Sequence, residues 1–365
     1  MTLTIILIAI AAGLVVFALV YSLGMRSMAK SASRAPATAR RGETAGNPLS
    51  PAGSDGPPHD TEATEAVFDE CFKLAFGVQR FDYQISGPHA AVLAKVNENA
   101  AASVHQRDYF PRRPMLLPRL MQVLNDDEST RKELVRLILE DPALTGSVLQ
   151  RANSAAYRYS PEPVDSLDRA VVMLGNDGLR SLMAVAILQP VFQQPKGYFD
   201  NFAPVTWEHA RRTAAAAEAC ARALGDADPF VAQLLGLLGP LSCIVLFRLT
   251  METYREHTGI LPRAEVFIRA MQLQGPQVAG LIAATWELSD PSLAAMLEQA
   301  DHVSPAAMTP LGRAIYFGEL CGALALLVKR GSYSVEGAQA MLMQQGLARE
   351  ATSKIWRAAE ADDQE

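Results

Sequence analysis

Apolar residues recur at helical spacing through most of the chain after residue 63. In residues 64–78 they form one broad face, and Gly77 is placed to end that helix. A second, Ala-rich stretch near residues 87–104 is also helical in pattern, although it is only moderately amphipathic. No convincing run of alternating apolar and polar residues indicates a strand. The pattern therefore predicts an all-α fold.

Turn and capping residues divide the remaining chain into further helices. Asp141 can cap a helix whose first position is Pro142, and Gly175 can end the helix that follows Ser166. Pro310 begins another strongly apolar helix. Residues 335–359 are predicted to form one continuous helix before an acidic tail.

The most apolar stretch of this region, Pro229–Phe247, has 19 residues and no charge. Gly239-Pro240 lies at its centre, and because Pro lacks an N–H and clashes with the preceding turn, a helix break is predicted there. The length approaches that of a membrane span. Its Gln, Ser, Gly and Pro residues instead favour a helix buried in a domain core.

A true membrane anchor is predicted at the N-terminus. Residues 3–24 carry no charge and are long enough to cross a bilayer. Five basic residues then precede the first acid, Glu43: Arg26, Lys30, Arg34, Arg40 and Arg41. By the positive-inside rule, everything after the helix is cytoplasmic. A cleaved signal peptide is the alternative, but it would have a charged n-region and a shorter apolar run.

The chain is accordingly expected to have five parts. Residues 1–25 form the single-pass anchor, and residues 26–62, rich in Ala, Ser, Pro, Gly and Arg, form a flexible tether. Residues 63–108 form a helical segment, and the pattern leaves open whether it packs on the main domain. Residues 109–335 form that domain, and residues 336–365 form the C-terminal helix and acidic tail. His59-Asp60, in the tether, is a chance pairing.

Charge and cysteine content limit the possible partners and cofactors. A net charge of −6 argues against a dominant nucleic-acid surface, so no nucleic acid is expected as a partner. The cysteines have no CxxC spacing and are expected to be buried, reduced thiols rather than zinc ligands: Cys71, Cys220, Cys243 and Cys321.

Several segments in a fixed order resemble a known family. LPRLMQVLND, LILEDPALTGSVLQRANSAAY, VDSLDRAVVMLGNDGLRSL and WEHA follow one another as in the HDOD domain, a bacterial regulatory domain related to metal-dependent HD phosphohydrolases. The resemblance runs from about Met115 to about Leu327. It implies signalling through protein contacts or a small ligand. With the predicted anchor, it places the domain on the cytoplasmic side of a bacterial inner membrane, with unidentified cytoplasmic signalling proteins as partners.

The resemblance also locates the place where a metal would bind. HD phosphohydrolases need a His, an adjacent His-Asp pair and a later Asp to hold metals that activate water. WEHA matches the segment of the first His, at His209, and the pattern GLLHDIG aligns with GLLGPLS in residues 236–242. Gly239 and Pro240 thus stand where His and Asp would be, and neither can ligate a metal. The expectation is no metal, no cofactor and no catalysis, with His209 as a packing or hydrogen-bonding residue beside Trp207.

Other polar residues are candidates for ligand or partner contacts. Asn153-Ser154 follows an apolar helical stripe, so it is either a capping turn or a contact site. Arg211 and the neighbouring Arg212 are expected on a solvated face that could meet an acidic partner. Trp207 is a further candidate contact.

Three more sequence patterns suggest a function, but each is better explained by an ordinary structural role. Asp301-His302 looks like a metal pair but is expected at the entry to a loop. Residues 174–188 resemble a helix-turn-helix, yet Arg180 is the only basic residue of its second helix. Met341, Met343 and Trp356 could form a docking surface, although core packing is the more ordinary role.

Two functions from other classes stay open. One is a phosphohydrolase with a rearranged metal site, built from His209, His257 or His302 and nearby acids. The other is a DNA-binding regulator, which would need a basic surface stripe.

Overall fold

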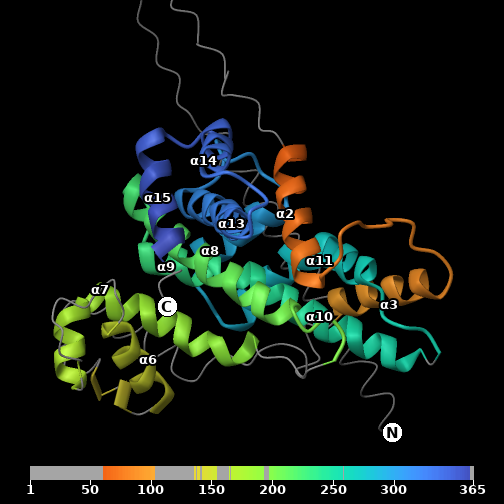
Figure 1. The fold of residues 1–365 in the computed structure, drawn as a ribbon, viewed down its shortest axis with the longest axis horizontal. Coiled ribbons are helices and arrows are strands. Elements are labelled where there is room, and N and C mark those ends of the chain that lie inside the picture. The colour runs from red at the N-terminus through yellow and green to blue at the C-terminus, as the bar shows by residue number, and fades with distance from the viewer. Residues whose placement is uncertain are drawn as a thin grey trace, which may run out of the picture. The chain divides into compact units, whose positions relative to one another are not determined.

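The computed structural model describes residues 61–102, 135–136, 138–139, 142–153, 164, 166–192, 197–257 and 259–361 (Figure 1). The predicted anchor, and the tether up to residue 60, lie outside the described residues. Every regular element in the described ranges is a helix, which confirms the all-α prediction.

Most of the helices begin or end at residues whose chemistry explains the boundary. Asp228 accepts hydrogen bonds from the backbone N–H groups of Phe230 and Val231, and Pro229 takes the first position of α9. Gly77, with φ of 67°, follows α2 as predicted. In chain order the helices are α2 (Thr61–Phe76), α3 (Pro88–Ala102), α6 (Pro142–Ala152), α7 (Leu167–Leu188), the 3₁₀ helix η2 (Gln189–Phe192), α8 (Phe202–Leu224), α9 (Pro229–Gly236), α10 (Leu238–Glu256), α11 (Ala264–Thr285), α12 (Asp290–Ala300), α13 (Pro310–Lys329), α14 (Val335–Gln344) and α15 (Arg349–Ala361).

Helices α8 and α13 form the most extensive helix pair, because small residues let their backbones approach closely. A Cβ added at Gly318 would lie 2.6 Å from the Cβ and 2.8 Å from the Cα of Ala217. One turn later, a Cβ at Gly322 would lie 2.6 Å from the backbone nitrogen of Thr213. Only glycine fits at these two positions without moving one of the helices.

The break in the apolar stretch falls slightly earlier than predicted. Helix α9 ends at Gly236 and α10 begins at Leu238, so Gly239-Pro240 lies in the first turn of α10 rather than at the break. Proline is tolerated there because the first N–H groups of a helix have no intrahelical acceptor.

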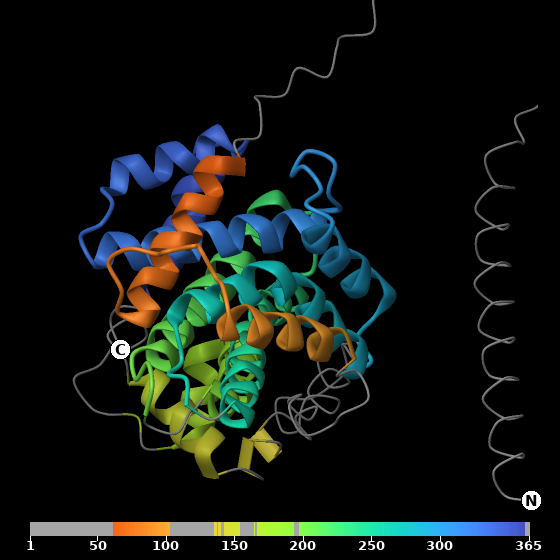
Figure 2. The same ribbon diagram turned by 90° about the vertical axis from the view of Figure 1, so that its right-hand side faces the viewer.

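Helices α2 and α3, whose packing the sequence left open, lie on the main body (Figure 2). Phe76 of α2 enters an aromatic cluster with its ring centroid 5.0 Å from that of Phe202 and 5.7 Å from that of Phe267. The Cys71 thiol donates to the backbone oxygen of Ala323 at 3.7 Å. Helix α2 is therefore joined to α8, α11 and α13, which lie far from it in sequence.

Helices α6 and α7 enclose a smaller core of their own. Gly175 interrupts α7 with φ of 67° and ψ of 176°, which agrees with the predicted stop although a second helical segment follows at once. Phe230 of α9 packs against this core and links it to the rest.

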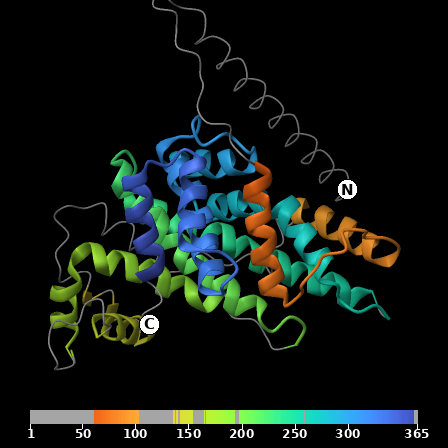
Figure 3. The ribbon, with the colours of Figure 1, turned by 45° about the horizontal axis from the view of Figure 1, so that its top comes forward.

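The C-terminal region corrects one prediction. Residues 335–359 form two helices, α14 and α15, instead of one. Gly346 lies between them with φ of 102°, a conformation that ends a helix. Trp356 is buried, so its role is core packing. Figure 3 shows α15 beside α8 and α13.

Within the described residues, two helical segments are long and apolar enough to cross a membrane by length and composition: Pro229–Glu256, which joins α9 and α10, and α13. Most of each is buried inside the described fold. Their apolar character is explained by their central position, as expected for Pro229–Phe247.

The close packing of α8 and α13 generates a stability prediction. Gly318→Ala should lower the free energy of unfolding by about 1–3 kcal/mol, because the added Cβ meets the backbone of Ala217. Urea unfolding of the full chain, followed by circular dichroism, measures this change. Gly280→Ala in α11 is the matched control, since its Cβ would meet nothing within 4 Å. That variant should gain roughly 0.5–1 kcal/mol, and equal losses in both variants would contradict the packing argument.

Candidate functional site

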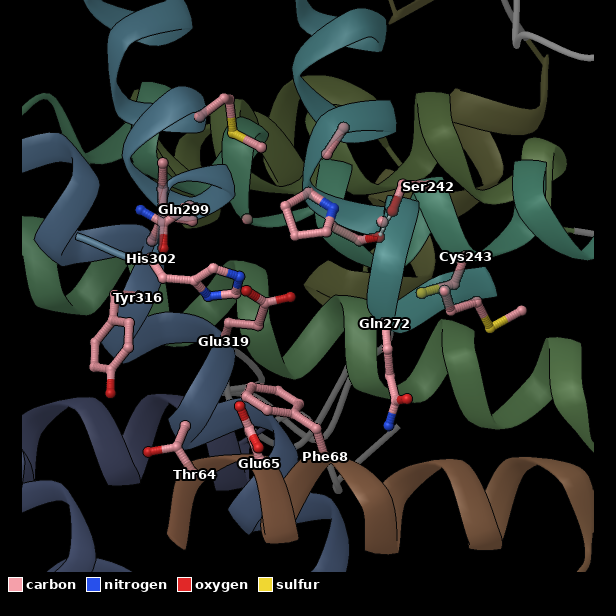
Figure 4. Close-up of a pocket in the computed structure, with 18 of the residues that line it drawn as sticks. Thr64, Glu65, Phe68, Ser242, Cys243, Gln272, Gln299, His302, Tyr316 and Glu319 are labelled. Carbon is pink, nitrogen blue, oxygen red and sulfur yellow. Dashed lines mark hydrogen bonds between the residues drawn. The ribbon is translucent and has the colours of Figure 1, made fainter. Parts of the chain in front are cut away.

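A cavity of about 410 Å³ lies where α2, α10, α11, α12 and α13 meet (Figure 4). This volume is in the range of small-molecule sites. Its walls are mostly aromatic, aliphatic and thioether side chains, with a few polar groups among them. The lining residues include Thr61, Thr64, Glu65, Phe68, Asp69, Phe72, Gly239, Cys243, Arg269, Met271, Gln272, Pro276, Met296, His302, Met308, Tyr316 and Glu319.

One face of α2 forms a wall of this cavity. Thr61, Thr64, Phe68 and Phe72 are spaced three or four residues apart, so they project from the same side of the helix. Asp69 lies at the edge of this face, where it accepts hydrogen bonds from Gln272 Nε2 at 2.8 Å and from the Tyr83 hydroxyl. The segment before the main domain thus completes the cavity.

Glu319 of α13 supplies a carboxyl group to the interior. Figure 4 shows its side chain directed into the cavity, toward the space that Phe68 and His302 also face. No hydrogen bond to this carboxyl occurs among the described residues. Burial raises the pKa of Glu319 to about 7. A carboxyl group without a partner is therefore held in surroundings that disfavour its charge.

The Glu319 carboxyl lies where a side chain of residue 239 would otherwise be. A Cβ added at Gly239 would lie 2.7 Å from Glu319 Oε1. Any side chain at residue 239 would have to displace that carboxyl. Glu319 also lines a second, smaller cavity of about 70 Å³, shared with His209 and Pro240. The three residues aligned with the HD metal site are therefore brought together, as the sequence implied, with Glu319 among them.

His209 lies on α8, facing α13. Its Nε2 is 3.4 Å from the backbone oxygen of Glu319, and its ring meets that of Phe68 edge-on at 6.5 Å. Burial lowers the pKa of His209 to about 4, and the positive charge of Arg212 acts in the same direction. The imidazole is thus neutral near pH 7.

The adjacent Glu208 binds several cations, two of them at the C-terminal end of α13. Its carboxylate pairs with Arg212 at 3.1 Å, Lys329 at 2.9 Å and Arg330 at 2.8 Å. Burial opposes its ionisation, but hydrogen bonds from Lys329 and Arg212, with that from Arg330, lower the pKa of Glu208 to about 2. The solvated face predicted for Arg212 is wrong, because its side chain is 1% exposed and also donates to the Ala359 backbone oxygen.

The other predicted contact residues lie away from the cavity. Asn153 donates to the backbone oxygens of Leu149 and Val164, and its Oδ1 accepts from Val164 N–H at 2.7 Å. Its amide is used to hold the chain after α6. Trp207 packs against Phe192, with ring centroids 4.8 Å apart and the ring planes tilted by 55°. Arg211 is half-buried on α8, and Ser154 lies outside the described residues.

Of the histidines proposed for a rearranged metal site, His302 lines the larger cavity and His209 the smaller one, each together with Glu319. His257 Nδ1 lies 2.9 Å from the backbone oxygen of Thr253, at the end of α10. His302 follows α12 with φ of 51°, at the loop entry that was predicted. Over the described ranges, no group of three His, Cys, Asp or Glu side chains could hold a metal ion. Gly239 and Pro240 offer no donor atoms, so the residues present do not fit the HD metal centre.

The cysteines follow the prediction closely. All four are free, and Cys71, Cys220 and Cys321 are buried. Burial raises the pKa of Cys243 to about 12, with Glu319 adding to the effect, so this cavity-lining thiol is protonated at neutral pH.

Glu319 is the site residue that sequence reasoning missed. A signal was present, because Glu319 is the sole charged residue between Arg313 and Lys329 in a strongly apolar helix. A lone acid in a buried helix normally has a specific environment.

Known proteins resemble this chain in sequence and in structure. The family model described as the HDOD domain matches residues 110–302. A Shewanella amazonensis SB2B structure, provisionally named a metal-dependent phosphohydrolase, aligns with a TM-score of 0.50 and 14% identity, covering 74% of this chain and 99% of that one. A Marinobacter aquaeolei VT8 structure, provisionally named a signal transduction protein, gives 0.47 at 20% identity, covering 85% and 66%.

One relative is similar in sequence. An uncharacterized protein of Treponema pallidum (strain Nichols) is 30% identical over 176 residues, which are 47% of this chain and 33% of that protein. The chain thus matches about a third of this relative's length.

The environment of Glu319 predicts a pH-dependent effect of its removal. Because its pKa is raised in the folded state, stability is lost as the pH rises from the unfolded value near 4.5 through about 7. Glu319→Gln should therefore stabilise the full chain at pH 8, by at most about 3 kcal/mol, and give little gain at pH 5.

Urea unfolding at both pH values tests this prediction. Glu256→Gln, an exposed carboxylate on α10, is the control and should change stability by less than about 0.5 kcal/mol. An equal effect of Glu319→Gln at the two pH values would show that the carboxyl is not penalised by burial.

Proposed function

We propose, since this chain belongs to the HDOD domain family, that it is a regulatory protein without phosphohydrolase activity, held at a bacterial inner membrane by residues 3–24. Its cytoplasmic domain acts through contacts with a small ligand or with signalling proteins. Residues 110–302 match the family, which is slightly more than half of the chain.

The contact between Gly239 and Glu319 is the observation that supports the absence of catalysis. A metal-binding His at residue 239 would begin 2.7 Å from Glu319 Oε1. Pro240, at the aligned Asp position, lacks a ligating side chain. A metal-activated water needs several fixed ligands, and this donor set does not provide them. The phosphohydrolase name of the Shewanella amazonensis SB2B structure belongs to that protein.

Metal content and phosphodiesterase activity test the proposed lack of catalysis. The full chain, purified in detergent and dialysed against manganese, iron, magnesium or zinc, should retain no stoichiometric ion by elemental analysis. Hydrolysis of bis(p-nitrophenyl) phosphate should equal that of buffer. His209→Ala should change neither result. A bound ion that this substitution removes, together with metal-dependent hydrolysis, would show that the chain is an enzyme.

Membrane extraction tests the anchor. The full chain should stay in the membrane pellet after alkaline carbonate treatment, because residues 3–24 are apolar and the other long apolar helices are buried. Leu14→Arg with Val15→Arg should release it, since each Arg costs roughly 2.5–3.5 kcal/mol at a helix centre. Leu49→Arg, in the predicted tether, is the matched control. Release of the unaltered chain, or retention of the double variant, would contradict the anchor.

A further inference from the structure

The cavity between α2 and α13 contains an acid without a partner. Glu319 faces the cavity from α13, and no hydrogen bond to its carboxyl occurs in the described part of the chain. A carboxylate out of water is stable only when a cation or several donors compensate its charge. The lining residues do not provide that compensation, so a ligand could.

The charges around the cavity are unbalanced toward the acidic side. Three carboxylates line it, those of Glu65, Asp69 and Glu319, against one guanidinium, that of Arg269. Arg269 donates to Gln272, the residue that bonds Asp69, so this cation lies with Asp69 at the α2–α11 edge. His302, after α12, Cys243, on α10, and Tyr316, on α13, also line the cavity with Glu319. Three carboxylates against one guanidinium leave a surplus of negative charge on the lining.

The rest of the lining suits the body of an organic cation. Phe68, Phe72 and Tyr316 offer aromatic faces, which attract ammonium groups as well as apolar carbon. Met271, Met296 and Met308 add flexible thioether surface. A strongly hydrated metal ion would find little to replace its water here, whereas an apolar amine could bury its carbon body.

The backbone adds a second acceptor near the cavity. Pro276 lies inside α11 and has no N–H, so the carbonyl of Gln272, four residues earlier, lacks its usual helical donor. Both residues line the cavity. An ammonium group has three N–H donors, and the Glu319 carboxylate alone leaves some of them without an acceptor.

We propose that this cavity binds a small amine with an apolar or aromatic body, whose ammonium group pairs with Glu319. This inference rests on the proposed non-catalytic function and identifies the ligand class of its domain. A bound ligand would contact α2 directly, because Thr64 and Phe68 line the cavity. It would also lie next to the hydrogen bond between Thr64 and Tyr316 of α13.

Calorimetric titration of the full chain at pH 8 tests the proposal with three probes of similar size. Phenethylamine carries an ammonium, 2-phenylethanol is neutral, and 3-phenylpropionate is an anion. The amine should bind at least about ten-fold more tightly than the alcohol, since one charge-assisted hydrogen bond contributes that much, and the anion should bind least. Titration of empty detergent micelles corrects for partitioning.

Two substitutions tie binding to the named residues. Glu319→Gln keeps the size of the side chain, and it should reduce amine affinity at least about ten-fold while leaving the alcohol unchanged. Phe68→Leu should weaken the amine more than the alcohol, because a cation loses its aromatic face. Glu256→Gln is the control, far from the cavity lining, and should match the unaltered chain. Circular dichroism confirms that each variant is folded.

Specific outcomes would overturn the proposal. Equal binding of amine and alcohol, tighter binding of the anion, or full amine affinity in folded Glu319→Gln would each contradict it. If no probe binds while the chain also lacks metal and phosphodiesterase activity, this inference fails and the proposed function stands. Metal uptake lost in His209→Ala would instead overturn the proposed function.

Discussion

The close approach of α8 and α13 is the constraint on which the site depends. Gly318 and Gly322 bring the α13 backbone against Thr213 and Ala217, with no room for a Cβ. Glu319 is the next residue after Gly318, so its position is fixed by this contact. Its backbone oxygen then meets His209 on α8, and its carboxyl reaches toward Gly239 on α10. This glycine-mediated contact thus positions Glu319 against both His209 and Gly239.

Gly239 and Glu319 are mutually dependent. If residue 239 had a side chain, the carboxyl could not stay where it is, and if the carboxyl moved away, a void would remain beside Gly239. Residue 239, at the position aligned with a metal ligand of HD phosphohydrolases, is glycine here, and the acid in this space comes from α13.

Much of the architecture could be predicted from sequence because it depends on local patterns. The all-α class was predicted from helical periodicity. Many helix ends were predicted from Gly77, Gly175 and the prolines at helix starts. The motif order gave the location of the altered metal site. The break between α9 and α10 was predicted two residues too late along the chain. Pro240 does not end a helix here, because it lies in the first turn of α10, where a backbone N–H would have no intrahelical acceptor.

The remaining features depend on contacts between distant segments. Arg212 is buried because Glu208, Lys329 and α15 surround it, and no pattern around residue 212 contains that information. The hydrogen bond from the Cys71 thiol to the Ala323 backbone oxygen connects residues that are 252 apart in the sequence. Glu319 is recognisable in the sequence as a lone acid in an apolar helix. Its place beside Gly239 could not be predicted, because Gly239 lies on a different helix.

The family match and the folded body have different limits. Residues 110–302 exclude both α2 and α13, yet these helices supply the Cys71–Ala323 contact, the Phe76 ring and two of the cavity walls. The family match is therefore shorter than the folded body. A fragment cut at residues 110 and 302 would expose to water the inner faces of α8, α10 and α11 that contact α2 and α13 in the whole chain.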